Sequence, residues 1–459
     1  MKIADVHAHV FPEKLAVKAA GSIGQFYGAE MYCEASMERL VAEEEKAGVS
    51  RYVIIGNSAA AVGCVEGIRQ QDKTGGITLI STEPHFTYSR PLISYLLWGK
   101  TDEGRMRYRP ADFYQKNRCE LLAGRTAVRI DIQEKSVQLD DGRRVSYDKL
   151  LVATGSRPFV PAMPGLEKVP QRFTFLSLDD ARRLEAALTP EARVLIVGAG
   201  LIGLKCAEGI FDRVGSLAVV DLADRVLPSI LDETGSRLVR QHLEKKGIRF
   251  YLSDSVSSFE GNTARLQSGA AVNFDLLVIA VGVRPNAELV QEAGGTVNRG
   301  ITVDAYGRTS LPDVYAAGDC TETTDIASGE SRVLALLPNA YMQGESAGTH
   351  MAGGTGKPYD RAIAMNAIGF FGYHVLTAGV YTGDTYAVEE NGAYKKLFYQ
   401  DNLLKGFILI GQVERAGIYT SLIRNRTPLD SLDFELIREK PQLMAFSRRV
   451  RARALSEQG

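Results

Sequence analysis

Apolar residues along the chain predict the same structural unit twice. A buried-strand pattern, RYVIIG, leads from residue 51 into a loop of small residues and a helix, and a second strand, ITLIS, follows. Residues 165–288 repeat this order, with ARVLIVGAGLIG as strand, turn and helix start and LAVVD as the second strand. Each stretch closes on a strand followed by glycine and Arg-Pro, LLVATGSRP and LLVIAVGVRP. Short apolar runs bounded by turn residues are typical of buried strands, so we interpret the repeat as a duplicated dinucleotide-binding unit.

The rest of the chain divides around these two units. Residues 356–459 alternate apolar and polar positions around LFYQDNLLKGFILIG, which predicts a β-rich region with terminal helices. The predicted fold class is therefore α/β, with two Rossmann-like dinucleotide-binding domains and a C-terminal α+β domain. The predicted segments are an N-terminal extension at 1–50, the first unit at 51–164 and 289–355, the second unit at 165–288, and the C-terminal domain at 356–459.

The second unit contains a complete glycine fingerprint, Gly198-Ala199-Gly200-Leu201-Ile202-Gly203. In such a turn the first glycine permits a tight bend, the second lets a pyrophosphate approach the backbone, and the third lets helix and strand pack closely. Asp221 ends the next strand, eighteen residues after Gly203. A carboxylate there can accept hydrogen bonds from ribose hydroxyls and would repel a 2′-phosphate, which favours NADH over NADPH.

The first unit has a degenerate fingerprint, Gly56-Asn57-Ser58-Ala59-Ala60-Ala61. Ser58 and Ala61 replace two glycines, but both are small enough for a pyrophosphate to approach the turn. Glu83 lies twenty-two residues past Ala61, at a strand end, where its carboxylate can hold a ribose.

Composition narrows the class of protein. Of the 459 residues, 45% are hydrophobic and 24% are charged, and the formal net charge is −1. This balance gives no general attraction to nucleic acid or to anionic lipid. We find no apolar run long enough for a membrane span and no secretory signal pattern. The five cysteines form no Cys-x-x-Cys pair, which favours a reducing, cytoplasmic setting.

Six motifs in order resemble one family, the pyridine nucleotide-disulphide oxidoreductase superfamily. They are RYVIIGNSAAAVG, ISTEPHFTYSRPLIS, LLVATGSRP, the complete glycine fingerprint, VIAVGVRPN and VYAAGDC. Within the superfamily the chain is most similar to the NADH-dependent rubredoxin, ferredoxin and nitrite reductase-like flavoproteins. The resemblance implies that the cofactors are FAD and NAD and that the NAD domain is inserted into the FAD domain.

The resemblance also assigns cofactor-binding residues. It implies that FAD meets Gly56, Ser58, Ala59, Glu83, Arg90, Gly318 and Asp319, with Ala127 and Val128 at the adenine and Thr154 and Gly155 close to the dinucleotide. It places Gly282 at the border of the NAD site. Independently of the resemblance, a carboxylate after a glycine turn, as at Asp319, can accept hydrogen bonds from ribityl hydroxyls.

The sequence departs from the family pattern where many members carry redox cysteines. The segment after Arg90-Pro91 reads Leu-Ile-Ser-Tyr-Leu and has no cysteine. Cys64 and Cys206 follow the two glycine turns, where we expect them to pack as small apolar residues. Electrons are therefore expected to leave directly from the flavin, without a redox disulphide.

A second departure concerns two charged positions near the flavin. Some related reductases carry a lysine after the serine of Arg-Pro-x-x-Ser and a glutamate two residues past the last fingerprint glycine. This chain has Tyr95 and Lys205 at those positions. We hypothesise that Lys205 points toward the junction of nicotinamide and flavin, where a cation would stabilise the negative charge of reduced flavin; the alternative is a surface lysine.

The N-terminal extension carries a different signal. SMERLVAEEEKAG predicts a short helix that ends at Gly48, and Asp5-Val6-His7-Ala8-His9 resembles the first strand of amidohydrolase-type metal hydrolases. His-x-His on a strand presents both rings on one face, as a metal site needs. About fifty residues cannot form the barrel that would supply further ligands, so we expect a fragment without metal or hydrolase activity.

The predicted activity is that of an FAD-dependent NADH:acceptor oxidoreductase, with hydride passing from NADH to flavin N5. The alternative is the NADH-binding flavoprotein subunit of an iron–sulphur 2-oxoacid oxidoreductase complex, such as a phenylglyoxylate dehydrogenase; a slow redox sensor is a further possibility. The stretch AIAMNAIGFFGYHVLTAG resembles the tail of such subunits and implies a domain that covers the flavin and forms a dimer interface. The expected partner is a redox protein acceptor or an iron–sulphur subunit. We expect the chain to form a homodimer or to be a subunit of a complex, and we expect it to bind neither nucleic acid nor a membrane.

Overall fold

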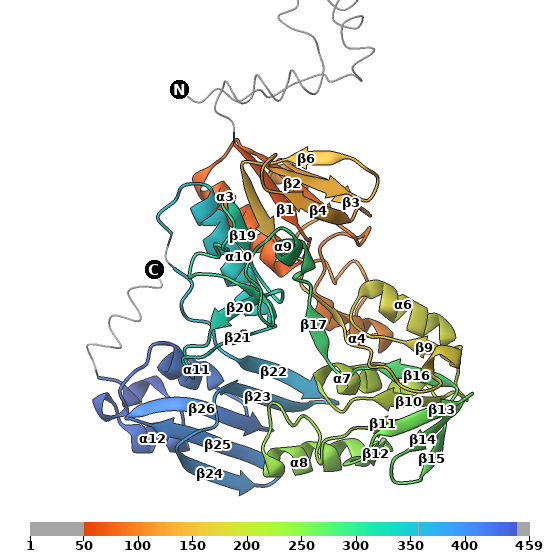
Figure 1. Ribbon diagram of the computed structural model, residues 1–459. Coiled ribbons are helices and arrows are strands. Elements are labelled where there is room, and N and C mark those ends of the chain that lie inside the picture. The colour runs from red at the N-terminus through yellow and green to blue at the C-terminus, as the bar shows by residue number, and fades with distance from the viewer. Residues whose placement is uncertain (1–49, 357, 448–459) are drawn as a thin grey trace, which may run out of the picture.

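The computed structural model describes residues 50–356 and 358–447 (Figure 1). The predicted helix ending at Gly48 and the His7-x-His9 motif lie outside the described residues.

The first unit is built on a parallel sheet of five strands in the order β19-β7-β1-β2-β3. Its strands come from both sides of the second unit in the sequence: β1 (Arg51–Ile55), β2 (Gly76–Ser81), β3 (Cys119–Ala123), β7 (Lys149–Val152) and β19 (Val314–Ala316). Because β19 pairs with β7 in parallel, the chain returns to the first sheet after completing the second. The segment boundaries given above stay predictions.

The second unit repeats this sheet, with five parallel strands in the order β12-β11-β10-β16-β9. They are β9 (Arg172–Phe173), β10 (Arg193–Val197), β11 (Ser216–Val220), β12 (Arg249–Tyr251) and β16 (Leu276–Ile279). The central strands β10 and β16 are almost wholly buried, as their apolar sequences require. The two sheets confirm the predicted α/β fold with two Rossmann-like domains.

The two Arg-Pro motifs of the repeat pair with each other. β8 (Ser156–Pro158) and β17 (Val283–Pro285) form an antiparallel ribbon that runs between the two sheets (Figure 1). Thr154 Oγ1 donates to the carbonyl of Asn286 at 2.6 Å, which fixes one end of the ribbon. The two copies of the Arg-Pro motif therefore pair with each other and link the first unit to the second.

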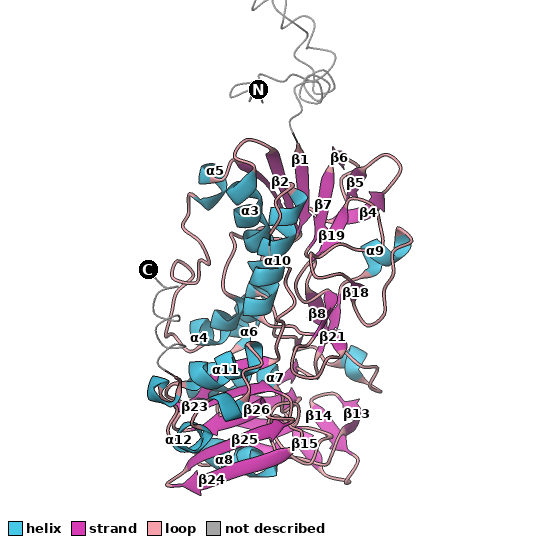
Figure 2. Cartoon of the chain, turned by 90° about the vertical axis from the view of Figure 1, so that its left-hand side faces the viewer, coloured by secondary structure: helices cyan, strands magenta, loops and turns pink. Residues whose placement is uncertain are grey.

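Two helices of the first unit, α3 (Ala59–Gln71) and α10 (Leu337–Met351), lie side by side (Figure 2), and their glycines bring the two backbones into contact. A Cβ atom on Gly63 would lie 2.2 Å from the carbonyl oxygen of Tyr341, and one on Gly344 would lie 2.0 Å from that of Ala60. Glycine at these positions removes the side chains that would separate the helices. The contact joins the segments of the first unit that precede and follow the second unit.

The C-terminal domain is an antiparallel sheet in the order β22-β23-β26-β25-β24, covered by helices, as the alternating pattern predicts. Its elements are β22 (Met365–Phe370), β23 (Tyr373–Gly379), β24 (Asp384–Glu390), β25 (Ala393–Gln400), β26 (Leu403–Ile410), α11 (Ala416–Arg424) and α12 (Phe434–Glu439). One apolar cluster joins Leu97 of α4 (Ile93–Leu97), Val278 of the second sheet and Ile408 of this sheet. Three parts of the molecule therefore share one core.

Smaller elements complete the fold. Asp141-Gly142, a predicted hairpin turn, joins β5 to β6, with Gly142 at φ +84°. The other elements are β4 (Ala127–Asp131), β5 (Ser136–Leu139), β6 (Arg144–Ser146), β13 (Val256–Glu260), β14 (Thr263–Leu266), β15 (Ala271–Asn273), β18 (Ile301–Thr302), β20 (Thr321–Thr324), β21 (Ser331–Val333), α5 (Phe113–Lys116), α6 (Leu178–Ala187), α7 (Leu201–Ile210), α8 (Glu233–Glu244) and α9 (Glu288–Glu292). Within the described residues, no helix has the length and apolar character needed to cross a membrane.

Candidate functional site

The glycine turn of the second unit has the geometry that its fingerprint predicts. Gly198 has φ +118°, and a Cβ atom there would lie 2.3 Å from the carbonyl oxygen of Ala280. A Cβ atom on Gly203 would lie 2.0 Å from the carbonyl oxygen of Gly198, whereas Gly200 faces open space. Leu201 and Ile202 begin α7, whose first amides point out of the helix end. The turn thus leaves room for phosphates where the helix can bind them.

Asp221 lies beside this turn and holds it in place. Its carboxylate accepts hydrogen bonds from the backbone amides of Ala199 at 2.6 Å and Ala223 at 2.8 Å. A carboxylate has about four lone-pair positions, so two remain for ribose hydroxyls. The side chain of the next residue, Leu222, is 72% exposed.

The first turn is similar but not identical. Gly56 has φ +128°, and a Cβ atom there would lie 2.2 Å from the carbonyl oxygen of Ala153. Ser58 is the N-cap of α3, but its hydroxyl makes no capping hydrogen bond. Ala59, the first residue of the helix, is buried. The Ser58 hydroxyl therefore makes no capping bond to the first amides of α3, the helix end at which a phosphate would bind.

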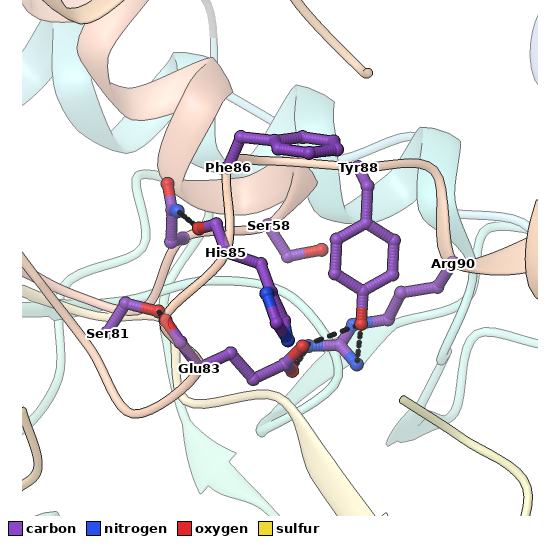
Figure 3. Close-up of a pocket in the computed structure, with 8 residues that line it drawn as sticks. Ser58, Ser81, Glu83, His85, Phe86, Tyr88 and Arg90 are labelled. Atoms are coloured by element: carbon purple, nitrogen blue, oxygen red, sulfur yellow. Dashed lines mark hydrogen bonds and ion pairs between the residues drawn. The ribbon is translucent and has the colours of Figure 1, made fainter. Parts of the chain in front are cut away.

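A pocket lies beside this turn and joins three of the predicted FAD residues, Ser58, Glu83 and Arg90 (Figure 3). Glu83 accepts a hydrogen bond from the Tyr88 hydroxyl at 2.6 Å and forms an ion pair with Arg90. Sequence reasoning missed the other lining residues, which are Asn57, Ser81, His85, Phe86 and Tyr88. Four of these five lie in the quoted motif ISTEPHFTYSRPLIS, so the motif itself was the available signal.

Asp319 enters the same region from the second part of the first unit. It follows Gly318, which has φ +87° and whose amide donates to Gln343 Oε1 at 2.8 Å. Burial raises the pKa of the Asp319 carboxyl, and the nearby Arg90 guanidinium opposes that rise. Arg90, the ion-pair partner of Glu83, thus also acts electrostatically on Asp319, a carboxylate from a distant part of the chain.

The remaining predicted positions stand on β4 (Ala127 and Val128) or in the loops after β7 (Thr154 and Gly155) and β16 (Gly282). The Arg125 amide donates to the Ser81 carbonyl at 2.9 Å, so the strand with Ala127 and Val128 passes beside the end of β2. Ala127 is buried and Val128 is 44% exposed. Gly155 has φ +65° and Gly282 has φ +114°, and a Cβ atom on either would meet nothing within 4 Å. Both glycines thus border open space, and Thr154 is bonded to Asn286.

Lys205 does not extend freely from α7. Its ammonium pairs with Glu208, lies 3.3 Å from the carbonyl oxygen of Gly369, and stands 4.4 Å from the centre of the Tyr95 ring. The ammonium thus makes two hydrogen bonds and one cation–π contact. The two positions that depart from the family pattern thus meet each other as a cation–π pair, between α4, α7 and β22. A catalytic role for Lys205 stays a prediction.

The described cysteines are Cys64, Cys119, Cys206 and Cys320, and none of these four forms a disulphide. Cys64 and Cys206 are fully buried in apolar clusters, in agreement with the packing role expected for them. Burial raises the pKa of both thiols, which keeps them protonated and unreactive.

The residues present fit two dinucleotides. Each unit has a parallel sheet, a glycine turn that no larger residue could form, a helix start and a carboxylate at the end of the neighbouring strand. The first unit adds a further acidic residue, Asp319, whose carboxyl pKa is raised by burial. Sites of this kind bind the phosphates through backbone amides and the ribose through the carboxylate.

Comparison with known proteins gives consistent matches. A sequence model of the family described as pyridine nucleotide-disulphide oxidoreductase matches residues 50–344. Nitrite reductase [NAD(P)H] of Bacillus subtilis is 32% identical over 83% of this chain and 48% of its own length. The epsilon subunit of NADH-dependent phenylglyoxylate dehydrogenase of Aromatoleum evansii is 30% identical, over 83% of this chain and 93% of that subunit.

Length and structure add two facts to these matches. The chain spans about half the length of the first curated relatives, 48% and 49%. The crystal structure of a covalent putidaredoxin reductase–putidaredoxin complex has the same fold, with a TM-score of 0.79 at 23% identity, over 89% of this chain and 99% of that one.

Proposed function

The chain belongs to the pyridine nucleotide-disulphide oxidoreductase family, and on that premise we propose that it is an NADH:acceptor oxidoreductase without a redox disulphide between FAD and the acceptor. It is an oxidoreductase that binds FAD and a nicotinamide dinucleotide, as its family does. The observation that carries the proposal is the pair of matching turns, each with a carboxylate at the neighbouring strand end.

Each unit contributes a distinct set of binding residues. Bound FAD would supply the redox chemistry, and the protein would bind and position it. Ser58, Glu83 and Asp319 would hold it in the first unit, with Arg90 balancing the charge of the two carboxylates. In the second unit the turn at Gly200 would hold the pyrophosphate of the nicotinamide dinucleotide. The protein would thus align the two reacting rings and exclude water between them.

The second unit favours NADH over NADPH. Asp221 is fixed by two backbone amides, so it cannot easily turn away from a ribose bound at the turn. A 2′-phosphate would lie against this carboxylate and be repelled. Anaerobic stopped-flow reduction tests the preference: NADH should bleach the flavin absorbance at much lower concentration than NADPH. Equal apparent affinities for the two would contradict the proposal.

Direct electron transfer from the flavin rests on the cysteines. The segment Arg90–Leu96 has no cysteine, and Cys64 and Cys206 are buried with raised thiol pKa values. An anaerobic dithionite titration should therefore take up two electrons per FAD. Four electrons per FAD would show a redox disulphide and refute this part.

We infer a one-electron redox protein as the acceptor. Support comes from the shared fold with a putidaredoxin reductase that was crystallised with putidaredoxin. Purified protein with NADH should reduce a rubredoxin or a ferredoxin faster than oxygen or a quinone. The reverse order would point to a small-molecule acceptor.

A second candidate is a flavoprotein subunit of a larger complex. The chain covers 93% of the epsilon subunit of phenylglyoxylate dehydrogenase, far more than it covers of nitrite reductase. Purification at native abundance distinguishes the two: co-purification with iron–sulphur subunits favours the complex, and a free homodimer favours the independent reductase.

A further inference from the structure

Three side chains that line the FAD pocket are bonded to one short segment of the second unit. This segment, residues 176–179, leads into α6 and is called the brace here. The Leu178 amide donates to the Tyr88 hydroxyl at 2.9 Å, and His85 Nε2 lies 2.8 Å from Asp179 Oδ1. Arg90 donates to the brace carbonyl at position 176 at 3.4 Å. The pocket wall and the brace are thus held together at three points.

The Tyr88 hydroxyl is the centre of these contacts. A tyrosine hydroxyl has one proton to donate and two lone pairs to accept with. The Leu178 amide and, at 3.3 Å, the Arg90 guanidinium can only donate, so they occupy the lone pairs. The proton must then go to Glu83, whose Oε2 lies 2.6 Å away. The direction of this hydrogen bond is fixed by its neighbours.

Glu83 is oriented as a result. Tyr88 holds one carboxylate oxygen and Arg90 holds the other. Two of the roughly four lone-pair positions of the carboxylate remain for further donors. The side chain is therefore preorganised to accept ribose hydroxyls, and little ordering is left to occur when the ligand binds.

The brace itself is rigid. Ser177 and Asp180 form a capping box at the start of α6, and the Asp180 carboxylate accepts from the backbone amides of Leu176 at 2.9 Å and Ser177 at 3.1 Å. Leu178 is 1% exposed and packs in the core that α4 shares with the second sheet. Because the segment is fixed in this way, the Leu178 amide is held in place to bind the Tyr88 hydroxyl.

We propose that Tyr88 and the brace are positioning elements of the FAD site, so that FAD affinity depends on a segment of the NAD-binding unit. Tyr88 acts through Glu83, which rests on the proposed role of Glu83 in FAD binding. The brace acts through the Leu178 amide and the Asp179 carboxylate. The partner contacts run between residues about ninety positions apart in the chain.

The test uses the full chain, stripped of flavin and titrated with FAD while flavin fluorescence is followed. Tyr88→Phe keeps the ring and removes the hydroxyl that holds Glu83. Loss of a hydrogen bond to a charged group predicts about ten- to hundredfold weaker FAD binding. The matched control is Tyr147→Phe, since Tyr147 is 1% exposed and its hydroxyl has no hydrogen-bond partner among the described residues. This control should bind FAD like the unaltered protein.

A double-variant cycle separates positioning from general loss of structure. In a Glu83→Gln background, Tyr88→Phe should weaken FAD binding by much less than in the unaltered background, because its target is already altered. Asp179→Asn should raise the FAD dissociation rate severalfold, because it weakens the contact with His85. This variant tests the proposal even if Tyr88→Phe does not fold. Amide exchange at residues 174–182 should slow when FAD binds.

The outcomes are distinguishable. If the unaltered protein does not bind FAD, the proposed function fails. If it binds FAD and Tyr88→Phe binds equally well, only the positioning role fails. Equal effects of Tyr88→Phe in both backgrounds would likewise overturn the role.

Discussion

The Lys205–Glu208 pair offers a sharp test of where α7 stands relative to the flavin. The two side chains are 15% and 2% exposed, and Glu208 Oε1 also accepts from the Phe371 amide at 2.6 Å. Lys205→Met leaves the cluster with one extra negative charge, and Glu208→Gln leaves it with one extra positive charge. If the pair lies beside the flavin, the two variants must shift its reduction potential in opposite directions.

The size of the shift follows from Coulomb's law. A unit charge roughly 10 Å from the reduced ring, at an effective dielectric constant of about 20, interacts with it by about 1.7 kcal/mol. For a two-electron couple this corresponds to about 35 mV. Lys205→Met should lower the potential by that order, because the anionic reduced form loses a nearby cation. Glu208→Gln should raise it, and the double variant should return close to the original value.

The assay is an anaerobic equilibrium titration against a reference dye, with flavin content checked by absorbance. The control is the exposed pair Arg240–Glu244 on α8, where Arg240→Met and Glu244→Gln are expected to leave the potential unchanged. Shifts of the same sign in Lys205→Met and Glu208→Gln, or none in either, would refute the reasoning. Lys205 would then be a structural link between α7 and the C-terminal domain.

Three further outcomes follow from the second turn and the helix crossing. Asp221→Ala with Leu222→Arg should reverse the preference toward NADPH, because the repelling carboxylate is lost and an exposed position gains a cation; ratios of kcat/KM for the two dinucleotides measure this. Gly198→Ala should abolish NADH binding and lower the melting temperature, since its Cβ atom would lie 2.3 Å from a carbonyl oxygen. Gly200→Ala should weaken NADH binding but leave the fold intact, because its Cβ atom would enter open space. Calorimetry measures the melting temperature of each variant, and an NADH titration measures its binding. Gly344→Val should separate α10 from α3, where even a Cβ atom would come within 2.0 Å of a carbonyl oxygen, and loss of bound FAD with a lower melting temperature would report it.

The sequence predicts the parts of the fold that depend on local pattern. The doubled order of strand, turn and helix gives both sheets, and Asp141-Gly142 gives its hairpin. Glu208, three residues after Lys205, could have been found from helical spacing alone. Its second partner, Phe371, could not, because it is 163 residues away and reaches α7 only through tertiary packing.

The same limit applies to the FAD pocket. The motif that contains Glu83 and Arg90 locates the pocket, but the roles of Tyr88 and His85 depend on a segment about ninety residues later. A hydroxyl's direction is decided by all its neighbours together, so no single stretch of sequence contains that information. The roles of Tyr88 and His85 are set by tertiary hydrogen bonds, which the sequence motif does not reveal.

The degenerate first fingerprint has a physical reason that the comparison of the two turns makes visible. In the second unit the last glycine, Gly203, is needed because its helix packs against its own turn. A Cβ atom on Gly203 would lie 2.0 Å from the carbonyl oxygen of Gly198. In the first unit Ala61 takes that position and is fully buried, so the turn there accommodates a methyl group. A tight contact lies instead at Gly63, where a Cβ atom would lie 2.2 Å from the carbonyl oxygen of Tyr341 in α10. Glycine thus stands where a backbone comes close, at Gly203 inside the second turn and at Gly63 against α10, and the first turn departs from the motif where there is room for a methyl group.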